Sequence, residues 1–73
     1  MEFFNNKGCG VCFEIAKKIT KQNTISLVAI LDKNEFATVL NLDKRGERWE
    51  CGNYFSDFED AYADYKERVT KNK

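Results

Sequence analysis

The sequence contains no histidine and no proline. Without histidine, the chain cannot form the Ser-His or Cys-His pairs that activate a nucleophile, and a metal site has to use cysteine, carboxylate, backbone or water ligands. The four glycines are scattered along the chain, so no glycine-rich loop can cradle a phosphate. Neighbouring carboxylates such as Glu59 and Asp60 point apart on a helix and make no acid–base pair. We therefore expect a binding protein without catalytic residues.

Long apolar runs are missing as well. The longest covers residues 27–31, only five residues, whereas a helix needs about 20 to span a bilayer. The first seven residues lack the charged start and apolar stretch of a signal peptide. Three cysteines are too few for a disulfide framework. These features predict a cytoplasmic protein with reduced thiols and no membrane association.

The composition is that of one small folded domain. The 12 Lys and Arg residues balance the 12 Asp and Glu residues, so no overall field attracts the chain to nucleic acid. Hydrophobic residues make up 42% of the chain and aromatic residues 14%, which is enough for a packed core. A chain of 73 residues has room for one such core, which predicts a single compact domain over residues 1–73.

The first half of the hydrophobic pattern predicts a helix followed by a strand. Val11, Ile15 and Ile19 recur at i, i+4 and i+8, as on the buried face of a helix over residues 11–21. The β-branched and apolar run over 24–31 is typical of a buried strand.

The second half predicts two more strands and a second helix. Residues 36–42 and 47–51 alternate as strands, and the first of them places one face in the order Phe36, Thr38, Leu40, Leu42. Ser56 and Glu59 match the capping box that begins a helix. We therefore expect an α+β fold of order α-β-β-β-α, with a three-stranded antiparallel sheet and both helices packed on one face.

The cysteines suggest a metal site. Cys9 and Cys12 form a C-x-x-C at a turn that enters the first expected helix, and Cys51 is followed by glycine as in half of a zinc knuckle. Zn²⁺ prefers four ligands, and small domains often need such a staple. The sequence predicts Zn²⁺ on Cys9, Cys12, Cys51 and Asp57. Alternatives for the fourth ligand are Glu50, Asp60 and Glu14.

Two other interpretations of the cysteines stay open. Residues 8–12, with Cys9 and Cys12 before the expected helix, resemble the start of a glutaredoxin. That resemblance implies a thiol redox protein with Cys9 as nucleophile and Cys12 as resolving thiol, although the missing proline and the three consecutive strands depart from the family. Alternatively, Cys12 and Cys51 are small buried hydrophobes and Cys9 is an exposed thiol.

The expected last helix carries an acidic face. Its carboxylates recur at i, i+3, i+7 and i+10, a spacing that suits either a solvated face or a surface for a basic partner. Exposed aromatic residues just before the helix would favour an interface. The candidate residues for binding a protein partner are Trp49, Tyr54, Asp57, Asp60, Asp64 and Glu67.

Nucleic-acid binding is a weaker alternative. The expected order of elements is shared with double-stranded RNA-binding domains, whose second helix begins with basic residues that contact phosphates. Here that helix begins with acidic residues, and the basic turn over 44–48 is diluted by Glu47. The acidic helix argues against RNA or DNA, leaving a small zinc-stabilised nucleic-acid adaptor as an alternative.

In size and expected architecture the chain is similar to the anti-CRISPR proteins. These are small phage or mobile-element inhibitors of RNA-guided nucleases. The resemblance rests on a short, single-domain α/β chain without histidine or proline; no motif is shared, and no functional residue is carried over. It implies an inhibitor whose acidic last helix, or the segment 49–55, occupies a basic groove of a CRISPR effector nuclease.

Overall fold

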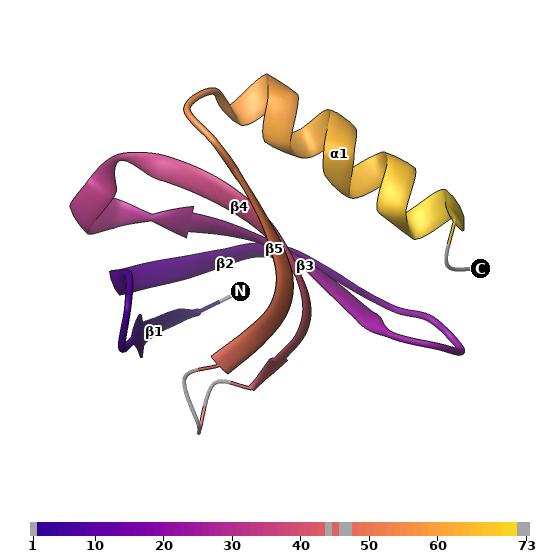
Figure 1. The fold of residues 1–73 in the computed structure, drawn as a ribbon, viewed down its shortest axis with the longest axis horizontal. Coiled ribbons are helices and arrows are strands. Elements are labelled where there is room, and N and C mark those ends of the chain that lie inside the picture. The colour runs from indigo at the N-terminus through magenta and orange to yellow at the C-terminus, as the bar shows by residue number, and fades with distance from the viewer. Residues whose placement is uncertain (1, 44, 46–47, 72–73) are drawn as a thin grey trace.

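The computed structural model describes residues 2–43, 45 and 48–71, which form one antiparallel sheet and one helix (Figure 1). The elements are β1 (Phe3–Asn6), β2 (Gly10–Ile19), β3 (Thr24–Ile30), the short 3-10 helix η1 (Leu31–Lys33), β4 (Glu35–Asp43), β5 (Arg48–Phe55) and α1 (Phe58–Lys71). The five strands lie side by side in chain order. Among the residues that the structure describes, no helix is long and apolar enough to cross a membrane.

The predicted α-β-β-β-α order is therefore wrong in its first half. The segment expected to be the first helix is β2, and β1 precedes it, so the sheet has five strands, not three. Val11 and Ile19, expected on a buried helix face, are exposed, whereas Cys12 and Glu14 are buried side by side in strand alternation. The β-branched residues of this segment favour a strand, which pairs with neighbours on both sides.

The second half of the prediction is closer to the structure. The expected strands over 24–31 and 36–42 are confirmed as β3 and β4, and the expected last helix is confirmed as α1. The third expected strand is longer than predicted, because β5 continues to Phe55. Its expected first residue, 47, lies outside the described residues.

One face of the sheet carries α1, which packs over β3, β4 and β5. Leu27, Thr38 and Asn53 are register neighbours across these three strands. Thr38 Oγ1 and Asn53 Nδ2 both donate hydrogen bonds to the carboxylate of Asp64 on α1. The alternate register row points to the opposite face; its members are Val28, Ala37 and Tyr54.

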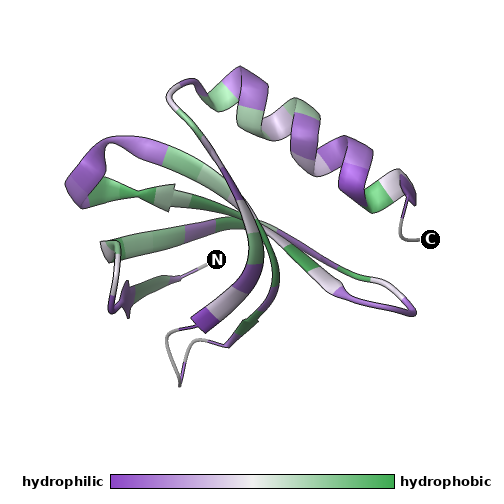
Figure 2. Ribbon diagram, viewed as in Figure 1, coloured by the Kyte–Doolittle hydropathy of each residue, from purple (hydrophilic) through white to green (hydrophobic). Residues whose placement is uncertain are grey.

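The main core lies on the opposite face of the sheet, and the sheet curls around it. The core consists of Phe4, Cys12, Val28, Ile30, Ala37 and Val39, with Cys9, Leu42 and Trp49 packed against it. The rings of Phe4 in β1 and Trp49 in β5 meet edge to face, 6.4 Å between centroids. The edge strands of a flat five-stranded sheet would lie about 19 Å apart, so the sheet curls until its edges touch. Figure 2 shows the hydrophobic residues concentrated in the strands, on which a largely hydrophilic helix lies.

Two bulges interrupt the β4–β5 pairing, and each contains a residue with left-handed backbone. Asn41 has φ 54° and Cys51 has φ 50°. The Asn41 amide accepts a hydrogen bond from the Thr24 N–H at 3.1 Å and donates to Glu50 at 2.9 Å. Because of the extra residue in β4, the Leu42 side chain packs against the main core. It does not share a face with Phe36, Thr38 and Leu40, as the alternation predicted.

Asp64 is the polar attachment of α1 to the sheet. Besides the hydrogen bonds from Thr38 and Asn53, its carboxylate forms an ion pair with Arg68 at 3.3 Å. Arg68 Nη2 in turn donates a 2.7 Å hydrogen bond to the carbonyl of Cys51 in β5. The fully buried Ala61 lets the helix lie close to the strands, so the helix is fixed both by contact and by a charged network.

Replacing Asp64 with alanine should therefore destabilise the domain. Asp64→Ala leaves two sheet donors and Arg68 without their acceptor, a loss we expect to lower the free energy of unfolding by about 2 kcal/mol. Asp60→Ala, which removes an exposed carboxylate of the same helix, should change it by less than about 0.5 kcal/mol. Urea denaturation measures both values, and equal stabilities of the two variants would contradict the role of Asp64.

Candidate functional site

Two aromatic residues on α1 are partly exposed. The exposed fractions of Phe58 and Tyr62 are 41% and 42%. They lie one turn apart with nearly parallel rings, 5.7 Å between centroids. Phe36 of β4 packs edge-on against Phe58 at 5.6 Å. The pair is thus exposed and yet supported by the sheet.

The neighbouring side chains further restrict Tyr62. The ring of Tyr65 lies 6.4 Å from that of Tyr62 at an angle of 18°. The Lys66 ammonium sits 4.7 Å from the centroid of the Tyr62 ring, a cation–π contact. Burial, followed by the nearby Tyr62 and Glu14, raises the pKa of Tyr65, so its phenol stays neutral at physiological pH.

Three exposed carboxylates stand next to Phe58 in the sequence, at the start of α1. Asp57, Glu59 and Asp60 are exposed, and in the described ranges none of them is in an ion pair. Their charge is favoured there because the helix N-terminus carries partial positive charge. Glu67, also predicted to bind a partner, is instead paired with Lys71 at 3.1 Å. We call Phe58, Tyr62, Asp57, Glu59 and Asp60 the α1 surface.

Of the predicted acidic face, only part is available to a partner. Asp57, Asp60 and Glu67 are exposed, but Asp64 is turned toward the sheet and engaged by Thr38, Asn53 and Arg68. Phe58, Glu59 and Tyr62 are also exposed, and they are not among the partner-binding residues predicted from the sequence. Asp64 follows the buried Ala61 at i+3, so these two residues lie on the same, sheet-facing side of the helix, and Phe58 and Tyr62 lie on its flank.

The other two predicted interface residues lie on the opposite face of the sheet. Trp49 packs against the main core, and its Nε1 donates a 3.1 Å hydrogen bond to Tyr54 Oη. Tyr54 is 52% exposed and pairs in register with Ala37, which faces away from α1. Trp49 and Tyr54 therefore lie together, but they do not share a surface with the acidic residues of α1.

The four predicted zinc ligands are not gathered into one group. Cys12 is buried in the main core, Cys9 packs against that core, Cys51 is exposed in the β5 bulge, and Asp57 precedes α1. Within residues 2–43, 45 and 48–71, no group of three or more Cys, Asp or Glu side chains is placed to hold a metal ion. Two of the alternative ligands are engaged elsewhere, since Glu14 accepts from Ser26 at 2.9 Å and Glu50 accepts from Asn41, and Asp60 lies exposed on α1.

The C-x-x-C segment is a β-hairpin turn, not the start of a helix. The Asn6 side chain accepts hydrogen bonds from the Gly8 and Cys9 N–H groups, both at 2.9 Å. Gly10 has φ 83°, and a Cβ there would lie 2.2 Å from the Asp32 carboxylate. The glutaredoxin-like mechanism needs a helix N-terminus to lower the pKa of the first thiol. Here no helix begins at that position, so this resemblance loses its physical basis.

Burial makes the Cys12 thiol a weaker acid than an exposed cysteine. Desolvation, followed by the nearby Cys9 and Asp32, raises the pKa of the Cys12 thiol to about 11. The thiol instead donates to the Gly10 carbonyl at 3.5 Å. A thiol that remains protonated at physiological pH is a poor nucleophile and a poor ligand, so Cys12 acts as a core residue.

The Cys12 pKa predicts a loss of stability in alkali. The unfolded chain releases this proton at its ordinary pKa of 9.0, whereas the folded chain keeps it until about 11. The free energy of unfolding should therefore fall by roughly 2 kcal/mol as the pH rises between these values. In urea melts, Cys12→Ala should lack this part of the decrease and Cys51→Ala should retain it; identical pH profiles of the two variants would contradict the assignment.

Gly52 provides the space for the Trp49–Tyr54 hydrogen bond. A Cβ at this position would lie 2.8 Å from Tyr54 Oη and 3.1 Å from Trp49 Nε1. Gly52→Ala should separate the two rings, shift the emission of the single tryptophan and destabilise the domain by about 1–2 kcal/mol. Gly8→Ala is the control, because its Cβ meets only the Asn6 side chain at an ordinary 3.5 Å. Unchanged emission in Gly52→Ala would show that the hydrogen bond does not hold Trp49.

Comparison with known proteins gives no match: no family model, no curated protein and no solved structure corresponds to this chain. Any function proposed for it must therefore follow from its own geometry. On the α1 surface, two exposed rings and three carboxylates outside any described ion pair lie at the start of one helix.

Proposed function

We propose that this protein is a binding module that uses the α1 surface to dock on a protein partner with a basic surface. The observation that carries the proposal is the exposed Phe58–Tyr62 pair on a helix that begins with three exposed carboxylates outside any described ion pair. Buried aromatic anchors supply most of the energy of protein interfaces, and a charged rim supplies orientation and association rate.

The rigidity of the pair supports this proposal. Phe36 packs against Phe58 from the sheet side. Contacts with the Tyr65 ring and the Lys66 ammonium group restrict the Tyr62 side chain. Side chains that are already ordered lose little conformational entropy when a partner covers them. Two rings on one helix therefore favour binding more than the same area of mobile side chains would.

For the partner, we propose a nucleic-acid-handling enzyme, in particular a CRISPR-guided nuclease that the protein inhibits. Lysine and arginine side chains that bind phosphates also form charge-assisted hydrogen bonds with carboxylates. Asp57, Glu59 and Asp60 offer such carboxylates within one helical turn. The proposal thus places α1 in the groove that the nucleic acid would otherwise occupy, as the similarity in size to anti-CRISPR proteins implies.

Neutralising two of the three carboxylates tests how much their charge contributes to binding. The double variant Asp57→Asn with Asp60→Asn removes two negative charges, and asparagine is also compatible with the start of a helix. Against a panel of purified RNA-guided nucleases, we expect about tenfold weaker binding and a matching loss of inhibition of DNA cleavage, with slower association. Glu35→Gln is the control: Glu35 has the same parity as Ala37 in β4 and so lies on the sheet face opposite α1, and this variant should bind as the native chain does.

Truncating the rings tests the anchors independently. Phe58→Ala with Tyr62→Ala should weaken binding about 100-fold or more, mainly through faster dissociation. Circular dichroism confirms that each variant keeps its fold. Undiminished binding by both double variants would contradict the proposal. Binding to another basic protein and to none of the nucleases would overturn only the choice of partner.

A further inference from the structure

A row of apolar residues crosses the sheet on the face that carries α1. Its members are successive register neighbours in β1, β2, β3 and β4, namely Phe3, Phe13, Ala29 and Phe36. Ala29 lies two residues after Leu27, which is on the α1 side, so the row is on that side too. The rings of Phe3 and Phe13 lie 4.8 Å apart between centroids, and Phe3 is 66% exposed. Because α1 packs over β3, β4 and β5, and β1 lies at the far side of the sheet from it (Figure 1), the β1–β2 part of the row lies beside the helix.

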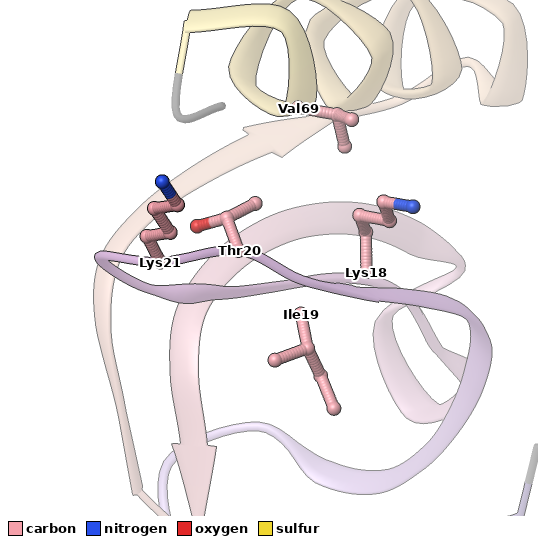
Figure 3. A pocket seen from close by; sticks show the side chains of 5 residues that line it. All are labelled: Lys18, Ile19, Thr20, Lys21 and Val69. Atoms are coloured by element: carbon pink, nitrogen blue, oxygen red, sulfur yellow. The ribbon is translucent and has the colours of Figure 1, made fainter.

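One flank of α1 borders this part of the sheet along its whole length. At the start of the helix, Phe58 packs against Phe36, a member of the row. Near its end, Val69 lines a hollow with residues 18–21 of the β2–β3 hairpin (Figure 3). Phe58 and Val69 are eleven residues apart, about three turns, and so lie on the same side of the helix, with Tyr62 between them. We call the row and this flank together the row–flank surface.

The two ends of the row–flank surface carry opposite charge. The exposed carboxylates of Asp57, Glu59 and Asp60 stand at the start of α1, and the exposed Lys18 and Lys21 stand at the hairpin beside its end. Within the part of the chain that the structure describes, none of these side chains belongs to an ion pair. Turned end for end, the surface therefore matches its own charges, and the net charge of zero adds no overall repulsion between copies.

We propose that a second copy of this chain covers the row–flank surface and forms a two-fold dimer. The two α1 helices lie antiparallel, and the aromatic flank of each helix packs beside the exposed β1–β2 row of its partner. In a two-fold interface every contact is made twice, so the carboxylates that begin each helix face Lys18 and Lys21 of the other copy.

The physical case for this occupant combines burial with charge. A sheet face is stable when a second layer covers it, and the single helix of one copy lies over β3, β4 and β5 only in the main. A second copy removes the exposed Phe3, Phe58 and Tyr62 from water. Antiparallel helices also bring the positive N-terminal end of each dipole next to the negative C-terminal end of the other. A nucleic acid would instead meet the carboxylates at the start of α1.

The dimer has a consequence for the α1 surface, and this consequence alone rests on the function proposed above. Phe58, Tyr62 and the neighbouring carboxylates are covered in the dimer, so a nuclease binds only the single chain. Dimerisation thus competes with inhibition, and raising the protein concentration favours the inactive pair by mass action.

Sedimentation equilibrium between about 1 µM and 1 mM chain tests the apolar part of the interface. We expect the native chain to reach the mass of two chains within this range, and Phe3→Gln to raise the dissociation constant at least tenfold. Ile19→Gln is the matched control, because Ile19 is 70% exposed and its side chain points to the other side of the strand (Figure 3). It should dimerise as the native chain does.

Charge reversal tests the end-for-end arrangement. Lys18→Glu with Lys21→Glu, and separately Glu59→Lys with Asp60→Lys, should each weaken self-association at least tenfold, because like charges then meet at both contacts. An equimolar mixture of the two variants should form a heterodimer, because each reversed end again meets an opposite charge. Circular dichroism confirms that every variant is folded.

Three results would overturn the dimer: a native chain that stays monomeric at 1 mM, equal effects of Phe3→Gln and Ile19→Gln, or a charge-reversed mixture that stays monomeric. Nuclease binding separates this proposal from the previous one. Lys18→Glu with Lys21→Glu leaves the α1 surface intact and should bind a nuclease at least as tightly as the native chain does. A monomeric variant that binds no nuclease would leave the dimer standing and contradict the proposed function.

Discussion

The contact between Phe4 and Trp49 is the constraint on which the rest of the fold depends. It joins the two edge strands of a five-stranded meander, so the sheet encloses its own core on one face. A small domain normally needs a second layer to bury each face of a sheet. Here the curled sheet serves as its own second layer, and the single helix is needed only for the other face.

The position of the α1 surface follows from the way in which that helix is attached. Asp64 and Arg68 point toward β4 and β5, where they meet Thr38, Asn53 and the Cys51 carbonyl. Because the middle of the sheet-facing side is taken by Ala61 and this polar network, Phe58 and Tyr62 are displaced to the flank. Exposure of the rings is thus a consequence of the charged attachment.

The sequence predicts the parts of this fold in which local pattern and tertiary packing agree. β3, β4 and α1 follow from composition, alternation and a capping signature. β2 could not be recognised, because its β-branched residues recur at a spacing that also suits a helix, and β1 is too short to stand out. Asp57 and Asp60 were placed on the surface correctly, but the inward turn of Asp64 depends on Thr38 and Asn53, donors distant in sequence.

The β5 bulge has a consequence for how the molecule behaves in a crowded solution. β5 is an edge strand of eight residues, and a straight edge of that length is a template on which another strand can add. The left-handed Cys51 bends the strand, and Arg68 occupies the carbonyl of that residue. The same two residues that anchor the helix thereby interrupt the ladder, and the open side of the sheet is protected against growing into a fibril.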